Sequence, residues 1–372
     1  MSIRTIKLLL TSFLFLSCFG TPQVFSQQSF QDPDAASLLA ELDEQLKVRS
    51  SEIIKLYQNA TPEERGSLPD INIEPYRELI PRYMDAANKF AKKQDAFPFL
   101  LRLVQAGRRL ENGRSFDSED PLIKHQRIAL NEILEHHSRD ARISSVIDAM
   151  IQSYHLSRDV YLDAIQRIDR DSTLPRVRAE CQYAIAMKEP NPLTREQLFE
   201  SVLRIDPESP VAEKAKINLF ELRYLSIGST PPSFVGESPD GSEIQLSDFH
   251  GKLVVLYFTS KNCGPCRAEI PATKARVKKY SDRPFVQLDI YTGPESKDDV
   301  STYIKQHEVT WPVIHDQHLD DMPGWYGPIG NQWNVYGTPT VFVLDHNGVI
   351  ISKNVRGKDL EDVVQSTLES MS

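Results

Sequence analysis

Residues 253–280 read LVVLYFTSKNCGPCRAEIPATKARVKKY, and this stretch decides the fold of the C-terminal part of the chain. Its first six residues form a continuous apolar run, which is typical of a central parallel strand covered on both faces. A helical pattern begins at Cys263 and continues to about Tyr280. The sequence therefore predicts two cysteines at the point where a buried strand leads into a helix.

The Cys263-Gly264-Pro265-Cys266 motif at this junction predicts redox chemistry. The first turn of a helix has unpaired backbone N–H groups and the positive end of the peptide dipoles, and both favour a thiolate over a thiol. We therefore expect Cys263 to be the attacking sulfur. Cys266, one turn further along, is placed to resolve the mixed disulfide that Cys263 forms with a partner protein.

The segments after this junction predict a mixed sheet. The strand Phe285–Tyr291 follows the helix and completes a β-α-β unit. Asn347-Gly348 separates two apolar segments, Val341–Asp345 and Val349–Asn354, and indicates a two-residue hairpin. A final amphipathic helix, Leu360–Met371, can cover one face. The predicted fold of this part is a three-layer α/β/α sandwich.

Glycine usage indicates the domain boundary. Twelve of the sixteen glycines lie from Gly228 onward, whereas residues 27–227 contain three. A helix-rich part followed by a turn-rich part has this distribution. We therefore predict an all-α domain of helical hairpins over residues 27–228 and an α/β domain over residues 229–372.

A weak internal repeat lies in the all-α domain from about residue 140. Residues 162–169 read LDAIQRID and residues 199–206 read FESVLRID. A proline and another helical pattern follow each segment, which predicts stacked helical hairpins. This part resembles tetratricopeptide-like repeats. The resemblance implies either a protein-binding surface or a helical spacer.

The first residues have the order of a secretory signal peptide. Basic residues precede the apolar run Leu8–Phe19, and a region of small residues ends at Ser26. We therefore predict a signal peptide over residues 1–26 and a periplasmic or otherwise exported chain. Leu16-Ser17-Cys18 partly resembles a bacterial lipoprotein box. Because the residues before Cys18 fit that pattern poorly, secretion without a lipid anchor is the preferred interpretation.

Composition and charge exclude several classes. The formal net charge is −9, so a nucleic-acid partner is not expected. No segment after the signal region reaches the ~20 apolar residues of a membrane-spanning helix. Cys181 lies on an apolar helix face and fits a small buried hydrophobe. Too few cysteines remain for a disulfide framework, so the Cys263 and Cys266 pair is interpreted as functional.

The C-terminal part resembles thioredoxin-like proteins of the TlpA/ResA type, which are also called redoxins. The motifs that carry the resemblance are Pro232-Ser233-Phe234, Asp240-Gly241-Ser242, Leu246-Ser247-Asp248-Phe249, Gly251-Lys252, the CGPCRAEIP segment and Tyr336-Gly337-Thr338-Pro339-Thr340. The resemblance implies a thioredoxin-like fold and an exported thiol–disulfide oxidoreductase. It implies no cofactor beyond a redox-active Cys263–Cys266 disulfide.

The resemblance also implies roles outside the CGPC motif. Thr338-Pro339 matches the pair whose cis peptide bond turns the backbone toward the cysteines, where it can pair with an extended substrate segment. Glu269 matches a buried acidic residue of the ResA-like group. It would take the proton from Cys266, provided that burial raises its pKa. The alternatives are a strand-entry proline and a solvated helix glutamate.

Two positions depart from the family pattern. Asn262 stands where an aromatic residue usually precedes the first cysteine, and Tyr257 stands at the position of thioredoxin's buried aspartate. An exposed aromatic side chain supplies contact area for partners, so its absence predicts a narrower set of partners. The aromatic, glycine-rich stretch 318–330 either contacts a partner or packs as a surface loop.

Three alternatives compete with thiol–disulfide exchange. A redoxin-type peroxidase needs Thr or Ser three places before its cysteine and Pro seven places before it; Ser260 fits, but Leu256 does not. A zinc site needs two ligands beyond the cysteine pair, and the nine histidines show no matching spacing, so no metal is expected. In the third alternative the helical domain is an adaptor and the α/β domain serves only for docking.

The sequence therefore predicts a thiol–disulfide oxidoreductase, and the Gly-Pro dipeptide favours the reducing direction. The predicted partners are disulfide-containing client proteins and a membrane-bound or exported thiol electron donor. A further protein partner is expected on the helical domain if that domain is a binding surface and not a spacer. Reduction potentials within this fold differ widely, so the direction of transfer stays open at this point.

Overall fold

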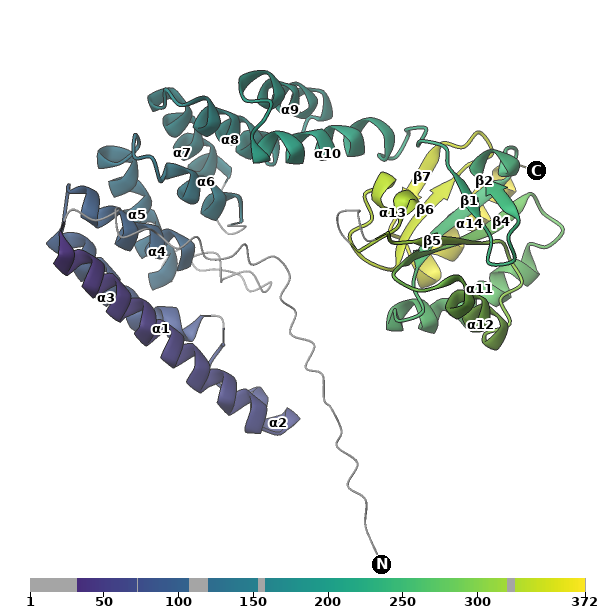
Figure 1. Ribbon diagram of the computed structural model, residues 1–372, viewed down its shortest axis with the longest axis horizontal. Coiled ribbons are helices and arrows are strands. Elements are labelled where there is room, and N and C mark those ends of the chain that lie inside the picture. The colour runs from purple at the N-terminus through teal and green to yellow at the C-terminus, as the bar shows by residue number, and fades with distance from the viewer. Residues whose placement is uncertain (1–31, 72, 107–119, 153–157, 320–324, 372) are drawn as a thin grey trace, which may run out of the picture. The chain divides into compact units, whose positions relative to one another are not determined.

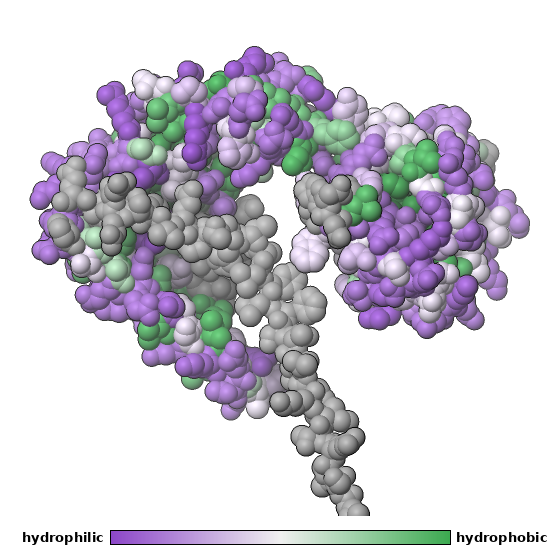
Figure 2. Space-filling model, in the orientation of Figure 1, coloured by the Kyte–Doolittle hydropathy of each residue, from purple (hydrophilic) through white to green (hydrophobic). Residues whose placement is uncertain are grey.

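The computed structural model describes residues 32–71, 73–106, 120–152, 158–319 and 325–371. The chain divides into two compact units, Met1–Lys188 and Glu189–Ser372, which are described separately (Figure 1). Hydrophilic residues cover most of the visible surface of each unit (Figure 2). Every helix in the described ranges is too short or too polar to cross a membrane. The predicted signal peptide, Cys18 included, lies outside the described residues.

The first unit is helical. It contains α1 (Pro33–Asn59), α2 (Pro62–Arg65), α3 (Glu74–Lys89), the 3-10 helix η2 (Gln94–Ala96), α4 (Phe97–Ala106), α5 (Pro121–His136), α6 (Ile143–Ile151), α7 (Arg158–Asp171) and α8 (Pro175–Ala186). Helix α4 is the most deeply buried of these, because eight of its ten residues are buried. Its two polar side chains, Arg102 and Gln105, are half-buried and hydrogen-bonded to each other at 3.0 Å.

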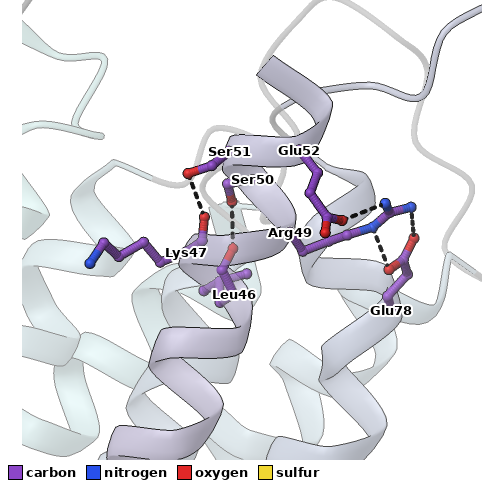
Figure 3. A network of polar contacts seen from close by, with 7 residues as sticks. All are labelled: Leu46, Lys47, Arg49, Ser50, Ser51, Glu52 and Glu78. Carbon is purple, nitrogen blue, oxygen red and sulfur yellow. Dashed lines mark hydrogen bonds and ion pairs between the residues drawn. The ribbon is translucent and has the colours of Figure 1, made fainter. Parts of the chain in front are cut away.

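An ion-pair network joins α1 to α3 (Figure 3). Arg49 on α1 donates through Nε and Nη2 to the two carboxylate oxygens of Glu78 on α3, each at 2.8 Å. Its Nη1 donates to Glu52 at 3.1 Å. This bidentate hydrogen bonding fixes the orientation of the guanidinium relative to the carboxylate. Because the groups are exposed to solvent, the network aligns the two helices more than it stabilises them.

Helices α9 (Pro192–Ile205) and α10 (Pro210–Tyr224) group with the C-terminal unit. Leu225, at the end of α10, is fully buried in the core of the sheet, and Phe220 packs against the same core. Glu221 on α10 forms an ion pair with Lys353. The compact units therefore divide before α9, whereas the sequence places the boundary near Gly228, where helices give way to strands.

The sheet of the C-terminal unit is mixed. Its strands are β1 (Val235–Glu237), β2 (Glu243–Gln245), β3 (Leu253–Thr259), β4 (Phe285–Gly293), β5 (Val313–Gln317), β6 (Thr340–Leu344) and β7 (Ile350–Lys353). They lie in the order β2-β1-β5-β4-β3-β6-β7. β3, β4 and β5 run parallel, and the other pairs are antiparallel. The predicted central strand is β3, which is buried over its whole length.

Helices on both faces of this sheet complete three layers. Helices α11 (Gly264–Lys279), α12 (Lys297–Gln306) and α14 (Gly357–Ser370) cover one face (Figure 1). The short helix α13 (Pro328–Gln332) and the end of α10 cover the other. Alternate residues of β3 enter the two cores, as a strand between two helical layers requires. The predicted three-layer sandwich and helical N-terminal part are confirmed.

Candidate redox site

The two cysteines lie at the N-terminus of α11, directly after β3. Their sulfurs form a disulfide, with the Cα atoms 5.2 Å apart. Cys263 caps the helix, and its Sγ accepts a hydrogen bond from the backbone N–H of Cys266 at 3.1 Å. Both cysteines are buried, whereas Gly264 and Pro265 between them are exposed. Pro265 suits the first helical turn, where its missing N–H is not needed.

The Thr338–Pro339 peptide bond is cis and leads into β6. Arg356 Nη2 donates to the carbonyl oxygen of Pro339 at 2.9 Å, which ties this segment to the turn after β7. A groove of about 520 Å³ runs along the segment. Its walls are formed by Glu221 on α10, residues 333, 334, 336–340 and 342, and residues 353, 354 and 356. Thr338 and Pro339 line this groove, whereas neither Cys263 nor Cys266 is among its lining residues.

Glu269 lies on α11, one turn beyond Cys266, and is half-buried. Its charge contributes to raising the pKa of Tyr257, so the carboxylate lies near that phenol. The structure thus places Glu269 between the two alternatives from the sequence, neither deep in the core nor fully solvated. Its role as a proton acceptor stays a prediction.

A buried polar cluster that sequence reasoning missed lies under α11. Asp289 on β4 is 6% exposed and accepts a hydrogen bond from Gln287 Nε2 at 2.7 Å. The guanidinium of Arg276 on α11 donates to Gln287 Oε1 at 3.3 Å. Burial raises the pKa of Asp289 from its ordinary 3.8 to about 6. Gln287 and Asp289 lie two residues apart, on one face of an otherwise apolar strand. This spacing could have indicated the buried polar cluster from the sequence.

A second missed residue, Glu295, follows β4 and contacts the residue before the first cysteine. Asn262 Nδ2 donates to Glu295 Oε1 at 3.3 Å, and Glu295 is 7% exposed. The position that usually carries an aromatic residue in this family therefore carries an amide held by a buried carboxylate. This contact ties the side chain of Asn262 to the segment that follows β4.

The stretch 318–330 is described except for residues 320–324. Its C-terminal part is held to the sheet by Asp316, whose carboxylate accepts from the backbone N–H groups of Ile329 at 3.0 Å and Gly330 at 2.8 Å. Thr292 Oγ1 donates to the same carboxylate at 2.8 Å. These hydrogen bonds favour a packed surface loop over a partner contact for this part of the stretch. Trp325, in contrast, is 78% exposed.

Two further expectations concern metal ligands and Cys181. Among the residues that the structure describes, no three His, Cys, Asp or Glu side chains are grouped as a metal site. Cys181 on α8 is buried and free, and burial raises the pKa of its thiol. Such a thiol is unreactive at neutral pH.

The strand order, the disulfide that begins α11 and the cis-proline segment define a thioredoxin-like redox domain. The sequence model described as "AhpC/TSA family" matches residues 227–353. Thioredoxin-like protein YneN of Bacillus subtilis is 32% identical over 124 residues, 33% of this chain and 68% of the relative. Thiol-disulfide oxidoreductase ResA of the same organism is 30% identical over 140 residues, 38% of this chain and 73% of the relative.

Solved structures include the thioredoxin domain of a thiol-disulfide oxidoreductase from Bacteroides vulgatus, at 25% identity. The match covers 38% of this chain and 98% of the chain in the solved structure, with a TM-score of 0.35. The chain belongs to the ResA-like family of thioredoxin-type thiol–disulfide oxidoreductases. The two relatives cover 33% and 38% of the chain, so this assignment does not extend to the rest of it.

Proposed function

We propose that this protein is an exported enzyme that reduces disulfides in client proteins through Cys263 and Cys266. One observation carries the proposal: a disulfide begins the helix after the central strand, in a chain whose relatives are named thiol-disulfide oxidoreductases. The helix N-terminus favours the thiolate that such exchange requires.

The reaction proceeds in two exchanges once a dithiol donor has reduced the site. The Cys263 thiolate attacks one sulfur of a client disulfide, forms a mixed disulfide and releases the other client sulfur as a thiolate. The Cys266 thiolate then attacks the sulfur of Cys263, which restores the internal disulfide and releases the second client sulfur. The client gains two electrons and two protons, and this protein loses them.

Glu269 takes the proton from Cys266 before the second attack, because it lies one turn beyond that cysteine on the same helix. Gly264 and Pro265 hold the cysteines in the first helical turn. An extended client segment pairs with the backbone of Thr338 beside the cis bond to Pro339. No cofactor other than the Cys263–Cys266 disulfide takes part in this scheme.

The reducing direction and the location rest on the sequence. The Gly-Pro dipeptide between the cysteines supports reduction, and the predicted signal peptide supports export to the periplasm or beyond. The electron donor is then a membrane-bound or exported thiol protein. The helical hairpins of the first unit supply a surface for a further protein partner.

Trapping of mixed disulfides tests this proposal. The Cys266→Ser variant removes the resolving sulfur, so clients should accumulate on Cys263 and separate on reducing gels. The matched control is the double variant with Cys263→Ser added, which should trap nothing. Equal yields from the two variants, or none from either, would contradict protein disulfide exchange.

A redoxin-type peroxidase is the second candidate, because the matching family model is that of the AhpC/TSA family. Leu256 stands where the peroxidase pattern has proline, so we expect no peroxide consumption above that of the Cys263→Ser control. Peroxide turnover that depends on Cys263 would favour the peroxidase. Binding of a partner protein that is unchanged in Cys263→Ser would favour the third alternative, in which the helical domain is an adaptor.

A further inference from the structure

A tight turn between β3 and α11 presents the sulfur of Cys263. The backbone N–H of Cys263 donates to the carbonyl oxygen of Ser260 at 3.2 Å and closes this turn, so Lys261 and Asn262 are its two central residues. The backbone of Cys263 is extended, with φ −77° and ψ 103°, as the N-cap position of a helix requires. The hydrogen bond from the N–H of Cys266 to the Cys263 sulfur depends on this conformation. The turn therefore helps to keep the sulfur at the N-terminus of α11.

Both central residues of the turn are tied to the segment that follows β4. Lys261 Nζ forms an ion pair with Asp299 Oδ1 at 2.6 Å, and both side chains are partly exposed. Asn262 Nδ2 donates to Glu295 Oε1 at 3.3 Å, and Glu295 is buried. Solvent screens the first contact, whereas a hydrogen bond to a buried carboxylate is screened less. The contact of Asn262 with Glu295 is therefore the stronger constraint on the turn.

Glu295 itself is held by the sheet. Its carbonyl oxygen accepts from His315 Nε2 on β5 at 2.8 Å. A Cβ atom at Gly293, the last residue of β4, would lie 2.6 Å from Glu295 Oε2, so the carboxylate packs directly against this glycine.

The hydrogen bonding of the Glu295 carboxylate is sparse. In the described ranges, the one hydrogen bond that this carboxylate accepts comes from Asn262. A buried carboxylate with so few donors is costly for stability. Packing alone thus gives no reason for an acid at this position, whereas a role beside the nucleophile does.

We propose that Glu295 is a positioning residue for the nucleophile: through Asn262 it holds the turn before Cys263, so that the sulfur stays at the N-terminus of α11. The inference rests on the proposed function, because it concerns the sulfur that attacks client disulfides. Glu295 acts here through geometry, since the charge of a nearby carboxylate by itself disfavours a thiolate. Loss of the hydrogen bond and loss of the charge therefore change the thiolate fraction of Cys263 in opposite directions.

Iodoacetamide labelling of Cys263 in the full-length Cys266→Ser protein separates the two effects. Asn262→Ala removes the donor and keeps the carboxylate of Glu295, so the sulfur should leave the end of the helix more often. Below the pH of half-maximal rate, labelling should slow about threefold to tenfold, as it does when the pKa of a thiol rises by about 0.5 to 1. Glu295→Gln removes the charge and keeps an oxygen that can accept from Asn262, so labelling should be unchanged or faster.

Two controls accompany these variants. In the double variant of Asn262→Ala with Glu295→Ala, the second change finds no hydrogen bond left to remove, so it should not slow labelling further. Lys274→Ala breaks the ion pair between α11 and Glu308, whose Nζ and Oε2 atoms lie 2.8 Å apart. Because this pair is exposed and lies further along the helix, its loss should leave the labelling profile unchanged.

A labelling profile of Asn262→Ala equal to that of Lys274→Ala would overturn the proposal. Slowing by Glu295→Gln as large as that by Asn262→Ala would overturn it as well, because the charge would then be what acts. If Glu295→Gln does not fold, the comparison of Asn262→Ala with Lys274→Ala decides alone. All of these measurements use a small reagent, so they remain valid if no client is trapped. Failure to trap clients would contradict the proposed function and leave the positioning of Cys263 to be decided by labelling.

Discussion

Asp289 lies opposite Tyr257 in the parallel pairing of β4 with β3, and both side chains are buried. Paired residues on neighbouring strands point to the same face, so this carboxyl shares the face of the sheet that α11 and the disulfide cover. Tyr257 stands at the position of thioredoxin's buried aspartate, and in this chain a buried acid lies on the adjacent strand. The site therefore keeps an ionisable group under the cysteines, but with a phenol beside it.

The first prediction concerns the pH dependence of stability. Because the pKa of Asp289 is raised from 3.8 to about 6, the folded protein binds the carboxyl proton more tightly than the unfolded chain. Stability should fall as the pH rises from about 4 through 6. Asp289→Asn removes this penalty and should stabilise the protein above pH 6 by on the order of 2–3 kcal/mol relative to its effect at pH 4.

Urea unfolding of both proteins between pH 4 and pH 8 measures this difference. Asn keeps an oxygen that accepts from Gln287, so the lost ionisation is the main change. A difference in unfolding free energy that stays constant over this pH range would contradict the raised pKa.

The second prediction concerns the reactivity of Cys263. The backbone N–H that its sulfur accepts and the N-terminus of α11 should lower the thiol pKa below its usual ~8.5. In Cys266→Ser, the rate of iodoacetamide labelling should therefore reach half its maximum at a pH clearly below that value. Cys181 serves as an internal control, because burial raises its pKa and it should not react in the folded protein. A midpoint for Cys263 equal to that of free cysteine would remove the basis of the proposed mechanism.

Local sequence signals were sufficient to predict the junction of β3 and α11. The apolar run and the CGPC motif lie within fourteen consecutive residues, so no distant contact was needed to place Cys263. The cis bond before Pro339 followed only from the family resemblance. Asp289 could not be identified in advance, because the burial of a charged residue depends on what α11 and β3 place around it. The packing of Leu225 depends in the same way on a sheet that forms later in the chain.

The third prediction concerns the anchor of α13. Asp316→Ala leaves the N–H groups of Ile329 and Gly330 and the hydroxyl of Thr292 without their acceptor. Unsatisfied buried donors cost about 1–3 kcal/mol each, so the free energy of unfolding should fall by at least ~2 kcal/mol. Asp298→Ala, at an exposed position of α12, should change it little. Equal stability of the two variants in urea would show that the anchor does not matter.

The last prediction concerns the domain boundary, which is tested by whether the contacts of α10 with the sheet add to the free energy of unfolding. Leu225 is fully buried in the core of the sheet, and its replacement by Ala should cost about 2–5 kcal/mol. Leu193→Ala on α9, where the side chain is 71% exposed, is the control and should cost little. A chain of residues 189–372 should then unfold at a higher urea concentration than one of residues 229–372, because only the longer chain keeps Leu225 and Phe220 against the sheet. Equal midpoints would instead support the boundary near Gly228 that the glycine pattern indicates, and would make α10 a connecting helix whose contacts with the sheet add no stability.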